Sequence, residues 1–61
     1  FSWTKDRAIK VIASFDKDFD PIAANSLGED YLVARAKAYE DLKATFELNG
    51  KIYNTKTGRQ Q

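Results

Sequence analysis

Hydrophobic and polar residues alternate with a helical period in two segments of the chain and with a strand period in a third. In residues 3–15, apolar residues recur at spacings of three and four, which predicts an amphipathic helix. Ser2 or Thr4 is placed to cap the start of this helix, because a hydroxyl oxygen accepts a hydrogen bond from an otherwise unpaired backbone N–H.

The same period returns in a second helical segment, which is predicted to follow Ser26 and to continue to about Ala44. Its apolar positions are Leu32, Ala36, Tyr39, Leu42 and Phe46. Ser26, followed three residues later by Glu29, fits the capping box that opens many helices. Four alanines and no Gly or Pro between residues 31 and 44 add intrinsic helical propensity. This is the segment for which the pattern favours a helix most.

The connection between the two helices, residues 16–28, has no sustained period. Pro21 directs Asp20 away from helical dihedrals, so the first helix is expected to end before it. Phe19 and Ile22 are apolar and are expected to pack back onto the core. We therefore predict an ordered loop.

After Ala44 the period changes to that of a β-hairpin around Asn49–Gly50, a dipeptide that favours a type I′ turn. The register of a two-residue turn pairs Phe46 with Tyr53 across the strands and turns both rings toward the helices. The outer edges of the hairpin are expected to be unpaired. A further turn with Gly58 in the left-handed region and a frayed C-terminus, residues 59–61, complete the prediction.

These segments predict a small α+β fold, two helices followed by a C-terminal two-stranded β-hairpin. The 61 residues (1–61) suffice for a single small domain, and a domain of this size buries a modest core. The chain begins at Phe1, and we expect it to be a fragment or subunit of a larger assembly.

The sequence lacks the residues on which several common kinds of protein chemistry depend. With no Cys and no His, the chain has no disulfide, no common zinc site and no ordinary general base near neutral pH. The segment "DKDFDP" has alternating aspartates like a calcium loop, but Pro21 stands where that loop needs Gly and Leu27 where it needs Glu. We expect no enzyme activity and no catalytic, cofactor-binding or metal-binding residue.

Charge is distributed unevenly. Residues 16–30 hold five acidic residues and one basic residue, a net charge of −4, whereas residues 31–61 hold six basic and three acidic residues. The basic end, with Lys43, Lys51, Lys56 and Arg59 beside Tyr53, leaves a nucleic-acid-binding module as an alternative function, although the acidic middle would repel a duplex.

Aromatic residues are more numerous than two short helices can bury, and interfaces between proteins favour such residues. The favoured function is a non-enzymatic structural or docking module that binds another protein within a larger assembly. A small inhibitor that occludes a partner's site is a second alternative, and a homo-oligomer remains open. The expected partner-binding residues are Phe1, Trp3, Leu48, Lys51, Ile52 and Tyr53. We expect no association with a membrane, because no run of apolar residues is long enough to span a bilayer.

Residues 44–58, "ATFELNGKIYNTKTG", resemble a segment of tailed-phage virion proteins in which a helix leads into a Phe-x-x-x-Gly-Lys-x-Tyr-x-Thr hairpin. The positions that match are Phe46, Gly50, Lys51, Tyr53 and Thr55. The resemblance covers about a quarter of the chain and brings no catalytic residue with it. It implies an assembly role in a virion, so the expected location is soluble, either cytoplasmic or virion-associated.

Overall fold

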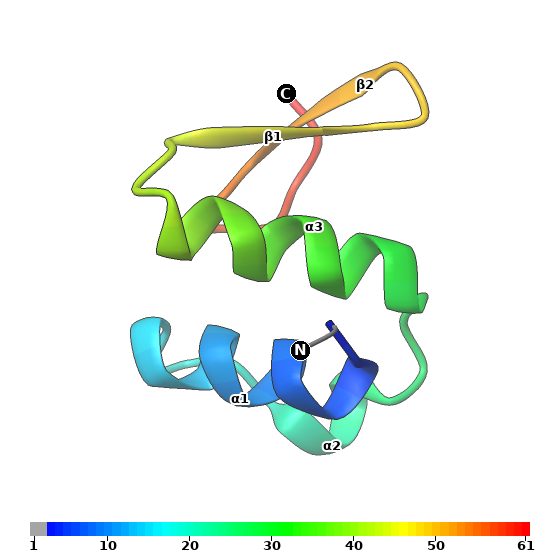
Figure 1. Ribbon diagram of the computed structural model, residues 1–61, viewed down its shortest axis with the longest axis vertical. Helices are drawn as coiled ribbons and strands as arrows, with labels where there is room; N and C mark the ends of the chain where they lie inside the picture. The colour runs from blue at the N-terminus through cyan, green and yellow to red at the C-terminus, as the bar shows by residue number, and fades with distance from the viewer. Residues whose placement is uncertain (1–2) are drawn as a thin grey trace.

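A computed structural model describes residues 3–61 and arranges them in three layers, with the longest helix in the middle (Figure 1). The elements in chain order are α1 (Lys5–Phe15), α2 (Pro21–Ala24), α3 (Glu29–Glu40), β1 (Thr45–Leu48) and β2 (Lys51–Asn54). The helices α1 and α2 lie on one side of α3, and the antiparallel hairpin lies on the other. The predicted α+β class is therefore confirmed, with one short helix added.

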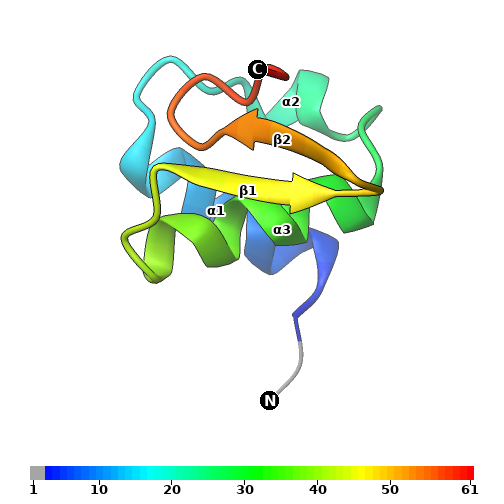
Figure 2. The same ribbon diagram turned by 90° about the horizontal axis from the view of Figure 1, so that it is seen from above.

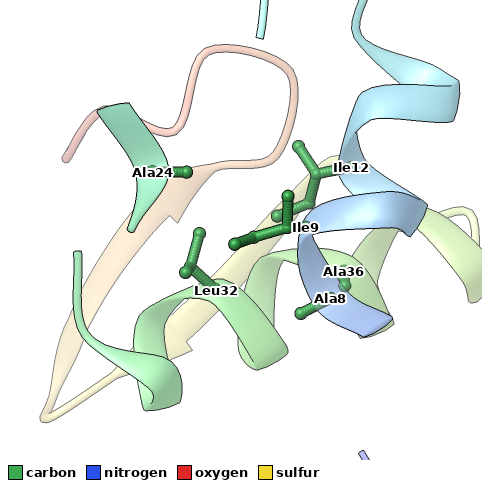
Figure 3. Close-up of a cluster of buried hydrophobic side chains, with 6 residues drawn as sticks. All are labelled: Ala8, Ile9, Ile12, Ala24, Leu32 and Ala36. Carbon is green, nitrogen blue, oxygen red and sulfur yellow. The ribbon is translucent and has the colours of Figure 1, made fainter. Parts of the chain in front are cut away.

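Helix α1 begins where the sequence predicts. The Thr4 hydroxyl accepts a hydrogen bond from the Arg7 N–H (3.2 Å), while Ser2 lies outside the described residues. The apolar face of α1 then packs against α2 and α3 and forms the core shown in Figure 3. The buried residues of this core are Ala8, Ile9, Ile12, Ala24, Leu32 and Ala36.

Helix α2 forms within the segment that was predicted to be a loop. Asp20 is its N-cap, with Oδ1 accepting from the N–H groups of Ile22 (2.9 Å) and Ala23 (3.3 Å), and Pro21 occupies the first helical position. Proline suits that position because its fixed φ is helical and its missing N–H would have no helical partner. Phe19 packs against the core as predicted, but Ile22 is 83% exposed, so that part of the prediction is wrong.

The predicted capping box at the start of α3 is also wrong. Gly28 is the N-cap and makes no side-chain capping bond. The Ser26 hydroxyl instead donates to the Ala23 carbonyl (2.8 Å). Because the short helix α2 places the Ala23 carbonyl close to Ser26, the hydroxyl bonds to the end of α2 and does not cap α3.

Helix α3 ends at Glu40, about one turn before the predicted end, because the chain closes it with a Schellman motif. The Leu42 N–H donates to the Tyr39 carbonyl (3.1 Å) and the Lys43 N–H donates to the Ala38 carbonyl (2.8 Å). This pair of bonds requires a left-handed residue between them, and Leu42 adopts φ 57°. Glycine is the usual residue at that position.

The hairpin has the predicted register. Phe46 pairs with Tyr53 and Leu48 with Lys51, and Asn49 and Gly50 have positive φ values of 54° and 79°. The Phe46 and Tyr53 rings stack at 5.3 Å between centroids, and both meet the Tyr31 ring of α3 edge to face at 5.7 Å. This aromatic cluster fastens the hairpin to α3.

The C-terminus is not frayed, and the outer edge of β2 is not unpaired. The Asn54 N–H donates to the Arg59 carbonyl (2.8 Å) and the Gln61 N–H donates to the Ile52 carbonyl (2.9 Å). Gly58, left-handed as predicted with φ 73°, helps to reverse the chain so that residues 59–61 lie antiparallel to β2. Figure 2 shows β2 between this terminal segment and β1.

Candidate functional site

The outer edge of β1 is the edge of the sheet that no segment among residues 3–61 covers. In an antiparallel hairpin closed by a two-residue turn, alternate residues direct their backbone groups toward the partner strand. Leu48 and Phe46 therefore bond to β2, and the N–H and C=O groups of Thr45 and Glu47 point outward. These outward groups form the free backbone edge.

A groove of about 380 Å³ runs between this edge and α3. Ala34 and Ala38 form its helical wall, and their small side chains leave space beneath the strand. Lys37 of α3 and Asp41, the residue that follows α3, also line it, one of each charge, together with Phe46 of β1. The edge thus combines exposed hydrogen-bonding groups with a partly apolar recess for side chains.

Arg35 holds the turn after β2 in place. It is 4% exposed, and its Nε donates to the Thr55 carbonyl (2.8 Å) while Nη2 donates to the Lys56 carbonyl (2.9 Å) and the Asp16 carboxylate (3.1 Å). The guanidinium also lies over the Tyr39 ring, 5.5 Å from its centroid. One side chain of α3 therefore ties the end of α1 to the C-terminal turn.

Tyr31 holds the other end of that turn. Its hydroxyl donates to the Gly58 carbonyl (2.5 Å), and a Cβ at position 58 would overlap the same hydroxyl. Burial raises the pKa of Tyr31 above its ordinary value of 10.0, an effect that the positive charge of Arg35 partly opposes. The tyrosine is therefore held as a neutral hydrogen-bond donor.

A second groove, of about 730 Å³, lies where α1 and α3 both end, at the left of Figure 1. Phe15 and Tyr39 stack there at 4.9 Å between centroids, and Leu42 stands beside them. Phe15 is 51% exposed and Leu42 is 88% exposed. Three lysines line the same groove: Lys17, Lys43 and Lys56.

The predicted partner-binding residues are dispersed. Phe1 lies outside the described residues, and Trp3 is half-buried against the core with the Arg7 guanidinium 4.7 Å from its ring centroid, so it does not project from the helix. Lys51 and Ile52 are exposed on β2. The remaining two are half-buried: Leu48 and Tyr53. Their role in binding a partner stays a prediction.

The sequence pattern alone does not distinguish the roles of Arg35 and Leu42. Position 35 lies next to the apolar positions 32, 36 and 39 of the helix, so a charged residue there signals a buried partner. Leu42 was assigned to the helix because its spacing fits. Its left-handed conformation depends on where the helix ends, and no residue type at that position marks it.

The loop aspartates serve the local backbone. Asp16 accepts from the Asp18 N–H (3.0 Å) as well as from Arg35, and Asp20 caps α2. Among residues 3–61, no group of three or more acidic side chains is arranged to hold a metal ion, and no helix is long and apolar enough to cross a membrane. No known protein family, curated protein or solved structure matches the chain.

Proposed function

We propose that the protein is a docking module that binds an extended segment of another protein along the free edge of β1. The observation that carries this proposal is the difference between the two edges of the hairpin. The chain covers the edge of β2 with its own terminal residues, 59–61, whereas the edge of β1 keeps the outward N–H and C=O groups of Thr45 and Glu47.

Strand addition at such an edge joins the two proteins through main-chain hydrogen bonds, and alternate side chains of the added strand enter a neighbouring recess. The groove beside Ala34 and Ala38 offers that recess. The edge is short, with the four residues of β1, so the bound segment is expected to be short and its binding to depend on the recess as well.

The hairpin's resemblance to those of tailed-phage virion proteins supports a virion as the setting of this docking. In such a setting the protein is a structural component without catalytic chemistry. The expected partner is then another virion protein, and the bound state is more stable than the free one because a ligand specific to the folded state stabilises it.

The test uses a substitution that blocks the edge without disturbing the fold. Glu47→Pro removes an N–H that points outward and places a ring at the edge, where proline is tolerated. Glu47→Gln is the matched control, since it removes the charge and keeps the N–H. A partner captured from the source lysate is expected to bind wild type and Glu47→Gln and to be lost from Glu47→Pro.

Amide hydrogen exchange on the purified pair provides the second readout. Binding at the edge slows exchange of the Thr45 and Glu47 amides more than that of amides elsewhere in the chain. If Glu47→Pro unfolds, a synthetic chain with an N-methylated Glu47 replaces it. Equal capture by the blocked variant, or unchanged exchange at these two amides, contradicts the proposal.

A further inference from the structure

Two exposed apolar side chains lie on separate surfaces of opposite charge. Leu42, 88% exposed, stands in the groove at the ends of α1 and α3, and Ile22, 83% exposed, stands on α2. In Figure 1, α2 lies away from the end of the molecule where that groove is found. Ile22 is not among the residues that line the groove of its own chain.

Leu42 is unfavourable for the isolated chain in two ways. Its φ of 57° is strained for any residue with a Cβ, and glycine would close the same Schellman motif without that strain. Its apolar side chain also lies almost wholly in water, so the chain gains little burial in return. A leucine that costs stability here is accounted for if another molecule buries it.

The groove around Leu42 has the shape and charge of a receptor for an acidic, apolar segment. One face of the Phe15 ring stacks on Tyr39, and half of the Phe15 surface is exposed. The basic residues that line the groove are Lys17, Lys43 and Lys56. The carboxylate in the same lining, that of Asp16, is already paired with Arg35 at 3.1 Å.

The surface around Ile22 has the complementary character. Asp18 and Asp20 precede it in the chain. The Asp20 side chain caps α2, and Asp18 is exposed. The amine of Lys5 contacts the opposite end of α2, where it donates to the Asn25 carbonyl (2.5 Å). Ile22 is thus an apolar side chain with carboxylates beside it.

We propose that Ile22 of one copy of the protein binds in the Leu42 groove of a second copy, with Asp18 and Asp20 facing the lysines. Because the two surfaces differ, the contact is head to tail, and a bound pair still presents one free groove and one free Ile22 surface. Repetition of the contact builds a ring or a filament.

Lys43 lines both this groove and the one beside β1, but Leu42 lines only the first and Glu47 only the second, so Leu42→Gly and Glu47→Pro test the two proposals separately. A contact built on one apolar side chain from each copy is weak, and dissociation constants between the micromolar and millimolar ranges are expected. Sedimentation equilibrium and NMR diffusion, carried to about 1 mM protein, cover that range.

Two variants each remove one surface. Leu42→Gly removes the apolar side chain of the groove and supplies the residue that the left-handed position favours, and Ile22→Ser removes the apolar side chain of α2. Each alone is expected to weaken self-association about tenfold or more, the effect of losing one buried aliphatic side chain. Leu42→Gly is expected to melt at the wild-type temperature or above it, so weaker association cannot reflect unfolding.

Mixing the variants supplies the decisive measurement. Ile22→Ser retains a groove and Leu42→Gly retains an intact α2 surface, so an equimolar mixture is expected to form a 1:1 dimer and nothing larger. Ile52→Ser, which removes an exposed apolar side chain outside both surfaces, is expected to associate like wild type, and so is Glu47→Pro. Asp18→Lys is expected to weaken association, and mixing it with Lys43→Glu restores part of it.

Three results overturn the proposal. The first is a wild-type protein that stays monomeric to about 1 mM, the top of the expected range. The second is a Leu42→Gly variant that associates like wild type, or a variant mixture that stays monomeric. The third is loss of all association in Glu47→Pro, which would assign the contact to the β1 edge.

Discussion

Leu42 and Gly58 adopt nearly the same left-handed conformation in opposite surroundings. Gly58, with φ 73°, lies beside the Tyr31 hydroxyl and the Arg35 guanidinium, where a Cβ has no room. Leu42, with φ 57°, projects its side chain into solvent. The turn at Gly58 is built for the stability of the chain itself, whereas the turn at Leu42 exposes an apolar side chain at the expense of that stability. The requirements of folding therefore explain the glycine at position 58, whereas they do not explain the leucine at position 42.

The largest expected loss of stability comes from removing the side chain of α3 that holds the turn before Gly58. Arg35→Ala removes the hydrogen bonds that the guanidinium donates to the Thr55 carbonyl, the Lys56 carbonyl and the Asp16 carboxylate. We expect a loss of about 3 kcal/mol in the free energy of unfolding, measured with urea. Arg35→Lys keeps the charge but cannot donate in three directions from a planar group, so it is expected to recover a part of the loss. A loss below about 1 kcal/mol for Arg35→Ala would show that the turn holds itself.

Gly58→Ala tests the same turn through its backbone. A residue with a Cβ is strained in the left-handed conformation, and this Cβ would also overlap the Tyr31 hydroxyl. We therefore expect a loss of about 2 kcal/mol in the free energy of unfolding. Gly28→Ala is the matched control, because Gly28 has an ordinary φ of −70° and open space where its Cβ would lie. That change is expected to stay within about 0.5 kcal/mol. Equal effects at the two glycines would remove the contrast on which the comparison depends.

Leu42→Gly is expected to act in the opposite direction. Relief of the left-handed strain is partly offset by the greater freedom of glycine in the unfolded chain, which leaves a gain of about 0.5 kcal/mol or somewhat more. Leu42→Ala keeps a Cβ in the same conformation and is expected to show little or no gain. Thermal and urea unfolding of the three proteins measure the difference. A destabilised Leu42→Gly variant would mean that the leucine side chain supports the isolated fold.

The last prediction concerns stability at alkaline pH. Because burial raises the pKa of Tyr31 in the folded state, the unfolded chain loses this proton first as pH rises above 10.0. Stability contributed by the neutral hydroxyl is therefore present below pH 10 and decreases above it. Tyr31→Phe is expected to be less stable at neutral pH by about 1 kcal/mol, through loss of the Gly58 hydrogen bond, and to decline less steeply above pH 10. Parallel pH profiles for the two proteins would contradict this assignment.

The sequence predicted the parts of the fold that depend on neighbouring residues. The Asn49–Gly50 turn determines its own register, and with it the stacking of Phe46 on Tyr53. Thr4 likewise caps α1 because its acceptor and the Arg7 donor are three residues apart. The positive φ of Gly58 was also predicted correctly, since few other residues adopt it without strain.

The parts that the sequence did not predict depend on distant partners or on competition between neighbours. Ser26 could serve either helix beside it, and the presence of α2 decided the outcome. The terminal residues 59–61 pair with β2 because Arg35, far away in the sequence, holds the turn that returns them. Both outer edges of the hairpin were predicted to be unpaired, and within residues 3–61 the structure leaves only that of β1 open. The Leu42 groove was not predicted, because it requires knowing where α3 ends.

The position of Trp3 provides an optical probe that distinguishes the two proposed surfaces. It is the single tryptophan of the chain, and it borders a depression lined by Ala34 and Lys37, residues that also line the groove beneath β1. Occupation of that groove changes the surroundings of the indole and hence its fluorescence. A molecule bound beside Leu42 contacts none of these lining residues and leaves the emission spectrum as it was. A fluorescence titration therefore reports which surface a ligand has found.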